Sequence, residues 1–258
     1  MNQVCYSSLC QHPLIAQLAE KIESTWRSQL MLSPYNTPTD LGYVEGTLEG
    51  EKLTIENHCY QTAQFRKLHL ELAKVGNHLD ILHCEKFHRS DFALQIFGVD
   101  IVESSNQISA AIVDLSPVLP GRCLPRNYEE ALKNSPYAEF SHPRALPDWG
   151  NIFSDFCLFV RPATHQEEAL FLDQAALFLA IHCRLSVQMS ASSSLEEQAL
   201  IVAGQRHYCA QQQKNDKTRR ILVRAFGVEW AERYLQTMLF DCAETTVAER
   251  SVSHCKQI

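Results

Sequence analysis

Apolar residues recur at two different spacings along this chain, and the change of spacing separates its elements. After Pro13, a residue suited to the first turn of a helix, apolar side chains recur every four positions as far as Trp26. This spacing predicts an amphipathic helix, which is expected to end before the pair Ser33-Pro34. From residue 42 to residue 115 the apolar spacing changes to two, which is typical of β-strands.

Six short segments alternate apolar and polar side chains, and turn signals separate them. The first two are predicted to form a hairpin that turns near Glu49-Gly50. The other connections are also short, so neighbouring strands must run antiparallel, because a parallel crossover needs a dozen residues or more. The predicted strands are Tyr43–Leu48, Leu53–Tyr60, Phe65–Lys74, Leu79–Phe87, Ile96–Val102 and Gln107–Asp114.

The second half of the chain is predicted to be a long loop followed by helices. Six of the ten prolines lie between Ser116 and Gly150, and a further strand is expected at Phe156–Arg161. Capping boxes at Thr164…Glu167 and Ser194…Glu197 predict the starts of two helices. Another helix is expected to end at Gly227, and Trp230–Leu239 has one apolar face, as an amphipathic helix does. The pattern predicts one α+β domain over residues 1–258, an antiparallel sheet with helices on both faces, and flexible tails at 1–11 and 242–258.

Composition excludes several classes of protein. With 45% hydrophobic residues the chain is not disordered, and its net charge of −7 disfavours a general nucleic-acid binder. The most apolar stretch, Ala169–Cys183, contains Asp173 and His182 and falls short of the ~18 apolar residues of a membrane span. Residues 1–11 lack an export signal, so a cytoplasmic protein is expected.

The motifs of the common cofactor and metal sites are absent from the sequence. None of the ten cysteines forms a C-x-x-C pair, and G-x-G-x-x-G, P-loop and G-x-S-x-G motifs are missing. His78, His83, Cys84 and His88 resemble metal ligands in composition. In a strand, however, His83 faces away from His78 and His88, so no metal site is predicted.

Ionisable residues lie among apolar ones on the predicted strands. His69 and Glu71 share one strand face, His83 shares a face with Glu85, and Asp100 lies on an otherwise apolar face. A carboxylate placed this way is costly to bury unless it is paired, protonated or functional. Spacing alone leaves two interpretations open: a functional site, or solvated faces that carry ordinary surface acids.

A basic segment stands out in this acidic chain. Residues 214–224 contain a single acid, Asp216, and five cations: Lys214, Lys217, Arg219, Arg220 and Arg224. Such a cluster forms an anion site or a docking surface for an acidic partner. The alternative is the solvated start of a helix.

Several of these stretches together resemble the ferredoxin-dependent bilin reductases. The resemblance extends from about His12 to Asp241. The matching stretches are Asp40–Gly46, Gln64–Lys74, Leu79–Cys84, Phe97–Asp100, Gln107–Ala111 and Gln213–Arg220. The resemblance implies a three-layer α/β/α sandwich that holds biliverdin IXα between the sheet and the C-terminal helices.

The resemblance also implies the chemistry. Reduced ferredoxin supplies single electrons, protein side chains supply protons, and no flavin, nicotinamide or metal takes part. The expected product is phycocyanobilin, reduced at the A ring and at the D-ring vinyl group. A one-electron-reduced bilin is a radical, so an acid placed near it with a suitable pKa directs where the proton goes.

The family resemblance further implies roles for individual residues. Asp100 and His83 are expected to protonate the bilin and steer A-ring reduction, and Glu71 serves the D-ring vinyl group. His69 is expected to be hydrogen-bonded behind His83, or else to be a structural histidine. The implied substrate-binding residues are Arg144 and Lys217 at the propionates, Ser109 at a propionate from the sheet, and Asn215 and Asp216 close to the pigment.

The chain departs from the family pattern directly after His83-Cys84. An apolar pair and prolines are usual there, whereas this chain has Glu85-Lys86-Phe87-His88. Glu85 shares a face with His83, so a regular strand places a third carboxylate in the pocket, and Glu85 joins the expected substrate-binding residues. A bulge after Cys84 would instead turn Glu85 into solvent.

Other functions stay open on the sequence. The chain could form a different phytobilin, act as a bilin carrier without catalysis, or bind haem through His182 or His207. As a reductase it is expected to be a monomer that docks acidic ferredoxin on the segment 214–224, away from nucleic acid and membranes.

Overall fold

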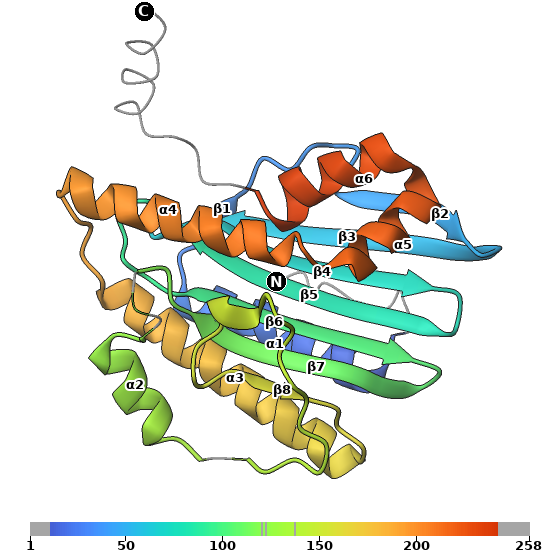
Figure 1. The fold of residues 1–258 in the computed structure, drawn as a ribbon, viewed down its shortest axis with the longest axis horizontal. Helices are drawn as coiled ribbons and strands as arrows, with labels where there is room; N and C mark the ends of the chain where they lie inside the picture. Colours follow the sequence, from blue (N-terminus) through green and yellow to red (C-terminus); the bar gives the residue numbers. More distant parts are fainter. Residues whose placement is uncertain (1–10, 120, 122, 137, 242–258) are drawn as a thin grey trace, which may run out of the picture.

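An antiparallel sheet of eight strands forms the middle layer of the protein (Figure 1). The computed structural model describes residues 11–119, 121, 123–136 and 138–241. The strand order is β1-β3-β4-β5-β6-β7-β8, and β2 also pairs with β3. From β2 to β7 each strand pairs with the next one in the sequence, as the short predicted connections require. Strand β8 also pairs antiparallel with β7, although a long segment that contains α2 separates the two.

The sheet consists of β1 (Ser33–Pro34), β2 (Tyr43–Leu48), β3 (Glu51–Gln61), β4 (Phe65–Val75), β5 (Leu79–His88), β6 (Ile96–Ser104), β7 (Gln107–Ser116) and β8 (Leu158–Val160). The helices are α1 (Pro13–Gln29), α2 (Arg126–Lys133), α3 (His165–Gln188), α4 (Leu195–Gln212), α5 (Asp216–Phe226) and α6 (Val228–Tyr234). A short 3₁₀ turn at Gly150–Ile152 and a π-helical turn at Leu235–Leu239 complete the described elements.

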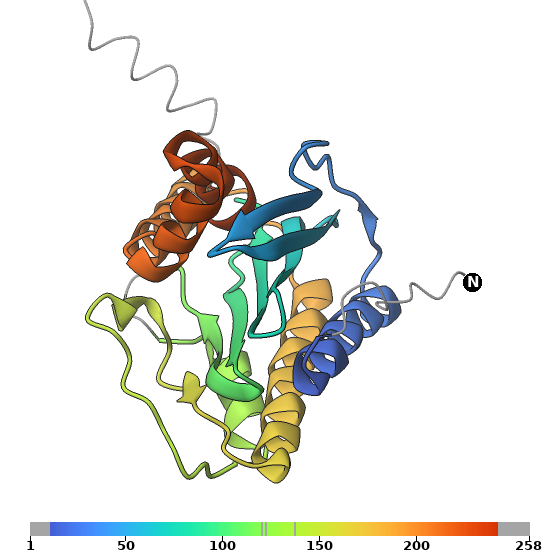
Figure 2. The same cartoon turned by 90° about the vertical axis from the view of Figure 1, so that its right-hand side faces the viewer.

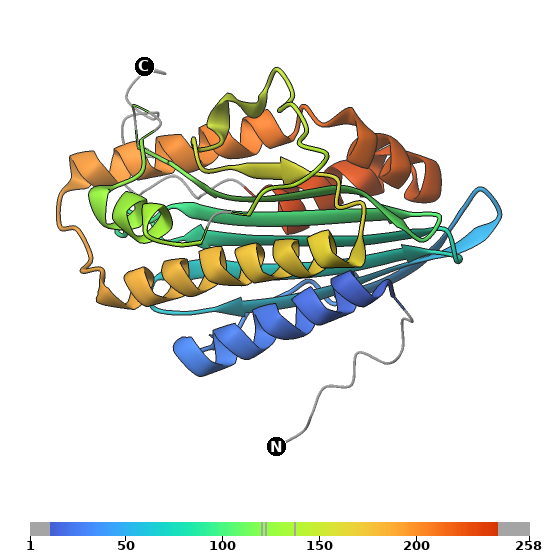
Figure 3. The same ribbon diagram turned by 90° about the horizontal axis from the view of Figure 1, so that it is seen from below.

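Two groups of helices cover the two faces of this sheet (Figure 2). Helices α1 and α3 pack side by side on one face, which we call the α1/α3 face (Figure 3). Helices α4, α5 and α6 lie over the opposite face, the α4–α6 face. The predicted α+β class with a central antiparallel sheet is confirmed, and the arrangement is a three-layer sandwich.

The predicted elements agree with the structure apart from their ends and three short additions, which are β1, α2 and the 3₁₀ turn. Most strands run one to three residues longer than predicted, whereas β8 is shorter than the expected Phe156–Arg161. The proline-rich region, which was predicted to be mostly loop, contains the helix α2. This helix begins directly after Pro125. The predicted tails lie outside the described residues, apart from Gln11.

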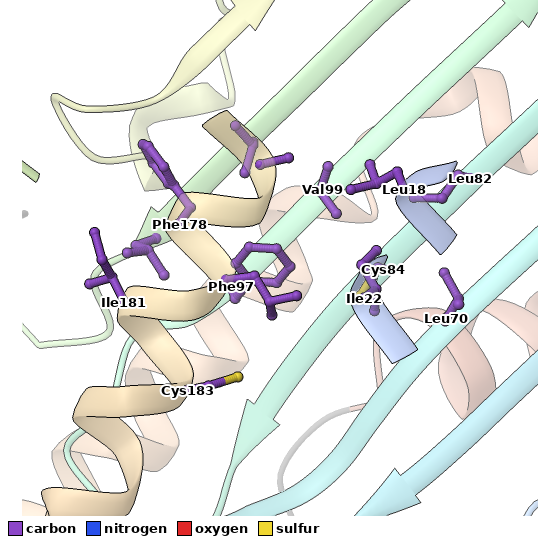
Figure 4. Packing of buried hydrophobic residues seen from close by; sticks show 14 of the residues in the cluster. Leu18, Ile22, Leu70, Leu82, Cys84, Phe97, Val99, Phe178, Ile181 and Cys183 are labelled. Atoms are coloured by element: carbon purple, nitrogen blue, oxygen red, sulfur yellow. The ribbon is translucent and has the colours of Figure 1, made fainter. Parts of the chain in front are cut away.

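The α1/α3 face is closed by apolar side chains (Figure 4). Leu70, Leu82 and Val99 project from three neighbouring strands and are fully buried. Leu18 of α1 and Phe178 of α3 pack into the same cluster. The alternation of strand side chains thus puts one continuous core on this face.

Helix α3 is also long and apolar enough to be considered as a membrane span. By length and composition it meets that criterion, with a mean hydropathy of 1.4 over its best window, half of which is buried. It packs against α1 and contacts β6 and β7. These contacts are those of the core helix of a folded domain.

Within the described residues, the six cysteines form no disulfide and no cluster of metal-ligating side chains is found. Cys84, Cys183 and Cys209 are buried, as expected for small apolar side chains. The sulfur of Cys183 accepts a hydrogen bond from Nζ of the buried Lys86, 3.0 Å away.

Candidate active site

A row of polar side chains crosses four neighbouring strands on the α4–α6 face. In the strand register Asn57 lies opposite Glu71, Glu71 opposite His83, and His83 opposite Asp100. Side chains at such opposite positions lie close together on the same face of a sheet. The three ionisable residues that the sequence placed on separate strands are therefore neighbours in one row.

His83 and Asp100 form the tightest pair of this row. Nδ1 of His83 lies 2.6 Å from Oδ1 of Asp100, so a protonated imidazole donates to the carboxylate. Burial alone would lower the pKa of His83, but Asp100 and the nearby glutamates outweigh it and raise that pKa to about 9. His83 is almost fully buried, whereas 39% of the Asp100 side chain is exposed. His83 is thus a charged acid at neutral pH, and Asp100 is the group that solvent reaches.

Glu71 occupies the other end of the row, beneath helix α6. Its Oε2 accepts a hydrogen bond from the hydroxyl of Tyr234 at 2.5 Å, and the same hydroxyl lies 2.9 Å from Oδ1 of Asn57. Burial raises the pKa of Glu71 above its ordinary value, although His83 and Tyr234 oppose the shift. Glu71 is 7% exposed, which rules out the interpretation as a solvated surface acid.

His69 corrects one expectation from the sequence. The predicted hydrogen bond to His83 is wrong: the two rings meet edge to face with centroids 5.9 Å apart. Nε2 of His69 instead lies 2.7 Å from Oδ1 of Asn57. Burial holds the pKa of His69 well below its usual range, and the charges of Lys67 and His83 add to this effect. The ring is therefore neutral and packs beside the row.

Glu85 enters the same site from strand β5. It lies opposite His69 on one side and Gly98 on the other, and it is 1% exposed. Strand β5 has regular pairing at this point, so the alternative of a bulge that turns Glu85 into solvent is contradicted. Burial raises the pKa of Glu85 to about 7.

Helix α4 supplies the partners of Glu85. The hydroxyl of Tyr208 donates to Oε1 of Glu85 at 2.9 Å, and Nε2 of Gln212 donates to the Tyr208 oxygen at 2.8 Å. A Cβ at Gly98 would lie 3.2 Å from the Tyr208 hydroxyl, tighter than most real contacts. Glycine at this position therefore lets Tyr208 reach the carboxylate.

A cavity of about 440 Å³ lies at the β6–β7 turn. Ser109 and Arg144 line it together with Arg161, and Nη1 of Arg144 donates to the carbonyl oxygen of Ser109. The Ser109 hydroxyl donates to the carbonyl of Val102, two residues along β6 from Asp100. The structure thus brings two of the predicted propionate-binding residues together at the β6–β7 turn.

The remaining predicted contacts lie at the start of α5. Asn215 caps this helix, because its Oδ1 accepts from the backbone N–H of Lys217 at 3.2 Å. Lys217 lines a different cavity, of about 660 Å³, together with Arg219, Arg220 and Arg224. Asp216 and Lys217 are exposed. A role for these residues at the pigment stays a prediction.

Sequence reasoning did not identify the tyrosines that bind the two glutamates. Tyr208 and Gln212 are four residues apart and so share one face of a helix. Tyr234 follows Ala231 by three residues on the apolar face predicted for the last helix. The hairpin register also places Asn57 opposite Glu71. These spacings could have indicated the partners.

The two histidines considered for haem binding are poorly placed for it. His182 is fully buried in the core of the α1/α3 face, where its Nδ1 lies 3.0 Å from the Tyr128 hydroxyl. Its ring is stacked on Phe97. His207 lies on the exposed side of α4. The described structure therefore offers neither as an axial ligand within a pocket.

The site combines three carboxyl groups, one cationic imidazole and one neutral imidazole under the C-terminal helices. Two of the carboxyl groups, Glu71 and Glu85, have a raised pKa because they are buried. Such a set can hold and deliver several protons near neutral pH. It is suited to a reaction that consumes protons at more than one position of a substrate.

Comparisons with known proteins agree with this chemistry. A sequence model described as ferredoxin-dependent bilin reductase matches residues 19–241. Phycocyanobilin:ferredoxin oxidoreductase from Trichodesmium erythraeum is 55% identical over 231 residues, covering 90% of this chain and 94% of that protein. The enzyme of the same name from Synechococcus elongatus is also 55% identical, over 89% and 93% of the two chains.

One solved structure shows the same fold at low sequence identity. Phytochromobilin synthase from tomato, solved in complex with biliverdin, has a TM-score of 0.67 and is 14% identical. The match covers 92% of this chain and 87% of that one.

Proposed function

The chain belongs to the ferredoxin-dependent bilin reductases, oxidoreductases that use ferredoxin, and we propose that it reduces biliverdin IXα to phycocyanobilin. The observation that carries the proposal is the row of Glu71, His83 and Asp100 on adjacent strands beneath the C-terminal helices. Relatives 55% identical over most of their length bear the name of this activity. One domain spans the chain, and it works in the cytoplasm without a tightly bound cofactor.

In this mechanism electrons arrive singly from ferredoxin and the row supplies protons. His83 and Asp100 protonate the reduced pigment and direct reduction of the A ring. Glu71, held by Tyr234 at the far end of the row, serves the D-ring vinyl group. The raised pKa of both His83 and Glu71 suits each to donate a proton near neutral pH.

The pigment propionates are bound by two cations, Arg144 and Lys217. Arg144 lies in the cavity beside β6 and β7, and its guanidinium suits a carboxylate. Ser109 supports it from the sheet. Lys217, with Asn215 and Asp216 at the start of α5, approaches the pigment from the helix layer.

The test is conversion of biliverdin by the purified protein under anaerobic conditions with a ferredoxin reducing system. Formation of a pigment that co-elutes with phycocyanobilin is the expected result. A different reduced bilin would overturn the product assignment, and a bound but unchanged biliverdin band would identify a carrier.

We place ferredoxin docking on the segment 214–224, with the enzyme acting as a monomer. Lys214, Lys217 and Arg220 are exposed there, while Arg219 pairs with Glu232 and Arg224 pairs with Glu49. Such a surface attracts an acidic partner even though the chain as a whole is acidic.

Turnover is therefore expected to fall as salt rises, because exposed charges are screened beyond about 8 Å at physiological ionic strength. The measurement is the initial rate at limiting ferredoxin over a series of sodium chloride concentrations. The charge-reversed variant Lys214→Glu should be slower at low salt and less salt-dependent. A rate independent of salt would contradict electrostatic docking.

A further inference from the structure

Glu85 is a buried carboxyl group that the mechanism above does not use. Its Oε1 accepts the hydrogen bond from Tyr208, whereas its Oε2 lies 3.8 Å from Nε2 of His83. Among the described residues, neither Oε2 of Glu85 nor Nε2 of His83 has a hydrogen-bond partner. Two unsatisfied buried atoms therefore face each other, one able to carry a proton and the other able to receive it.

The fold holds Glu85 firmly in this position. Gln212 donates to Tyr208, Tyr208 donates to Glu85, and Gly98 on the next strand leaves room for the tyrosine. A buried carboxyl group with one oxygen unsatisfied reduces stability, so an apolar side chain here would favour folding. This arrangement is what a site with a chemical task requires.

We propose that Glu85 stores a proton for bilin reduction and passes it from Oε2 to Nε2 of His83 after His83 has protonated the pigment. The inference rests on the proposed function, since it concerns the same reduction. Saturation of each double bond takes two electrons, supplied by ferredoxin, and two protons. His83 is nearly buried, and Glu85 is an acid within 3.8 Å of its Nε2 that can recharge it beneath a bound pigment.

The transfer is balanced without any further reactant. The Glu85 carboxylic acid becomes a carboxylate, and the neutral imidazole of His83 becomes an imidazolium. The new carboxylate and imidazolium attract each other at close range, and Nδ1 of His83 stays bonded to Asp100 throughout. Solvent recharges Glu85 after the product leaves.

The charges around Glu85 agree with this role. Burial raises the pKa of Glu85 to about 7, Asp100 adds to the shift, and His83, Tyr208 and Lys67 oppose it. Across β4, the facing His69 is neutral. The pKa of His83 is raised to about 9, so the proton moves downhill from Glu85 to a deprotonated His83.

The kinetic test follows single turnover of bound biliverdin in wild type and in Glu85→Gln, which keeps the shape and removes the stored proton. The vinyl reduction that Glu71 serves should be unchanged, and the A-ring reduction that His83 serves should slow by about 10²-fold, the scale of one general acid. Glu85→Asp should recover much of the A-ring reduction. Equal rates for wild type and Glu85→Gln would overturn the proposal.

The matched control is Lys86→Met, on the same strand and equally buried but facing the α1/α3 layer. It should leave both reductions at wild-type rates. If it slows the A-ring reduction as much as Glu85→Gln does, the effect comes from disturbance of β5 and the proposal is wrong.

A second measurement needs no turnover and separates this inference from the proposed function. The pKa of His83, followed by NMR of labelled histidine in ligand-free protein, should fall in Glu85→Gln because a nearby carboxylate is lost. An unchanged His83 titration would overturn the inference. Failure of the wild type to reduce biliverdin would overturn the proposed function and leave this titration result standing.

Discussion

The two faces of the sheet differ in burial as well as in chemistry: on β6 the residues that face α1 and α3 are buried, whereas Gly98, Asp100 and Val102 on the other face are half-buried. On the α1/α3 face, Leu70 and Leu82 lie opposite Cys84 and Ile101 across β4, β5 and β6. The residues next to Leu70, Leu82 and Ile101 in the sequence are Glu71, His83 and Asp100, which lie on the α4–α6 face. Because side chains alternate along a strand, each polar residue of the site is adjacent in sequence to an apolar residue of the core. The sheet thus separates stability from catalysis within a single set of strands.

The difference shows what a catalytic surface requires from the rest of a fold. The apolar face gains roughly 25 cal/mol per Å² of buried apolar surface. On the other face burial raises the pKa of Glu71 and Glu85 and lowers that of His69, which means that burial opposes their charged forms. The apolar layer offsets this cost, so the strands can hold acids at the pKa values that proton delivery needs.

The largest expected effect comes from Asp100→Asn on the α4–α6 face. An amide has nearly the same shape but cannot take part in proton transfer with His83, so turnover should fall by about 10²–10⁴-fold while biliverdin still binds. Steady-state rates and the bound-pigment spectrum measure the two quantities separately. Full turnover in this variant would remove Asp100 from the mechanism.

Leu82→Ala on the α1/α3 face should have the opposite profile. Leu82 is fully buried in the core, so the free energy of unfolding should fall by about 2–5 kcal/mol. The folded fraction should still form the same product, because the side chain faces away from the site. Urea denaturation and product chromatography check both points. A changed product would mean that the two faces are not independent.

A smaller and more selective effect is expected for Glu71→Gln. It removes the acid at one end of the row, and Gln can still accept the hydrogen bond from Tyr234. The D-ring vinyl reduction should slow by about 10²-fold, whereas the A ring is still reduced. Chromatography should then show an intermediate that keeps the vinyl group. If the vinyl group is reduced at the wild-type rate, Glu71 has another role.

Much of the fold could be predicted because it depends on local patterns. The period of two from residue 42 to 115 and the short turns determined the strands and their antiparallel pairing. Helix α2 was missed because the prolines around it conceal an eight-residue helix. The π-helical turn at Leu235–Leu239 has no sequence signal of this kind.

The site was less predictable because it depends on register and on contacts between layers. Strand parity put His69 with Glu71 and His83 with Glu85, but it could not say that Glu71, His83 and Asp100 lie in one row. Hydrogen bonds that bridge the sheet and the helices, such as Tyr208 to Glu85, join residues more than 120 positions apart. The wrong prediction of a hydrogen bond from His69 to His83 also came from missing register information, because the actual partner of His69 is Asn57 on the neighbouring strand β3.

Lys86 gives the finest test of the comparison, since it is an ionisable side chain on the apolar face. Its Nζ donates to Cys183 and lies 4.2 Å above the ring of Phe65, and burial lowers its pKa. Because the pKa of Lys86 is lower in the folded state, the free energy of unfolding of the protein decreases as pH falls below the ordinary lysine pKa of about 10.4. Lys86→Met should therefore raise the free energy of unfolding at pH 7 by about 1 kcal/mol, with a smaller gain near pH 10. Urea denaturation at the two pH values measures this difference. A loss of stability at pH 7 would mean that the cation contributes to the α1/α3 core through Cys183 and Phe65.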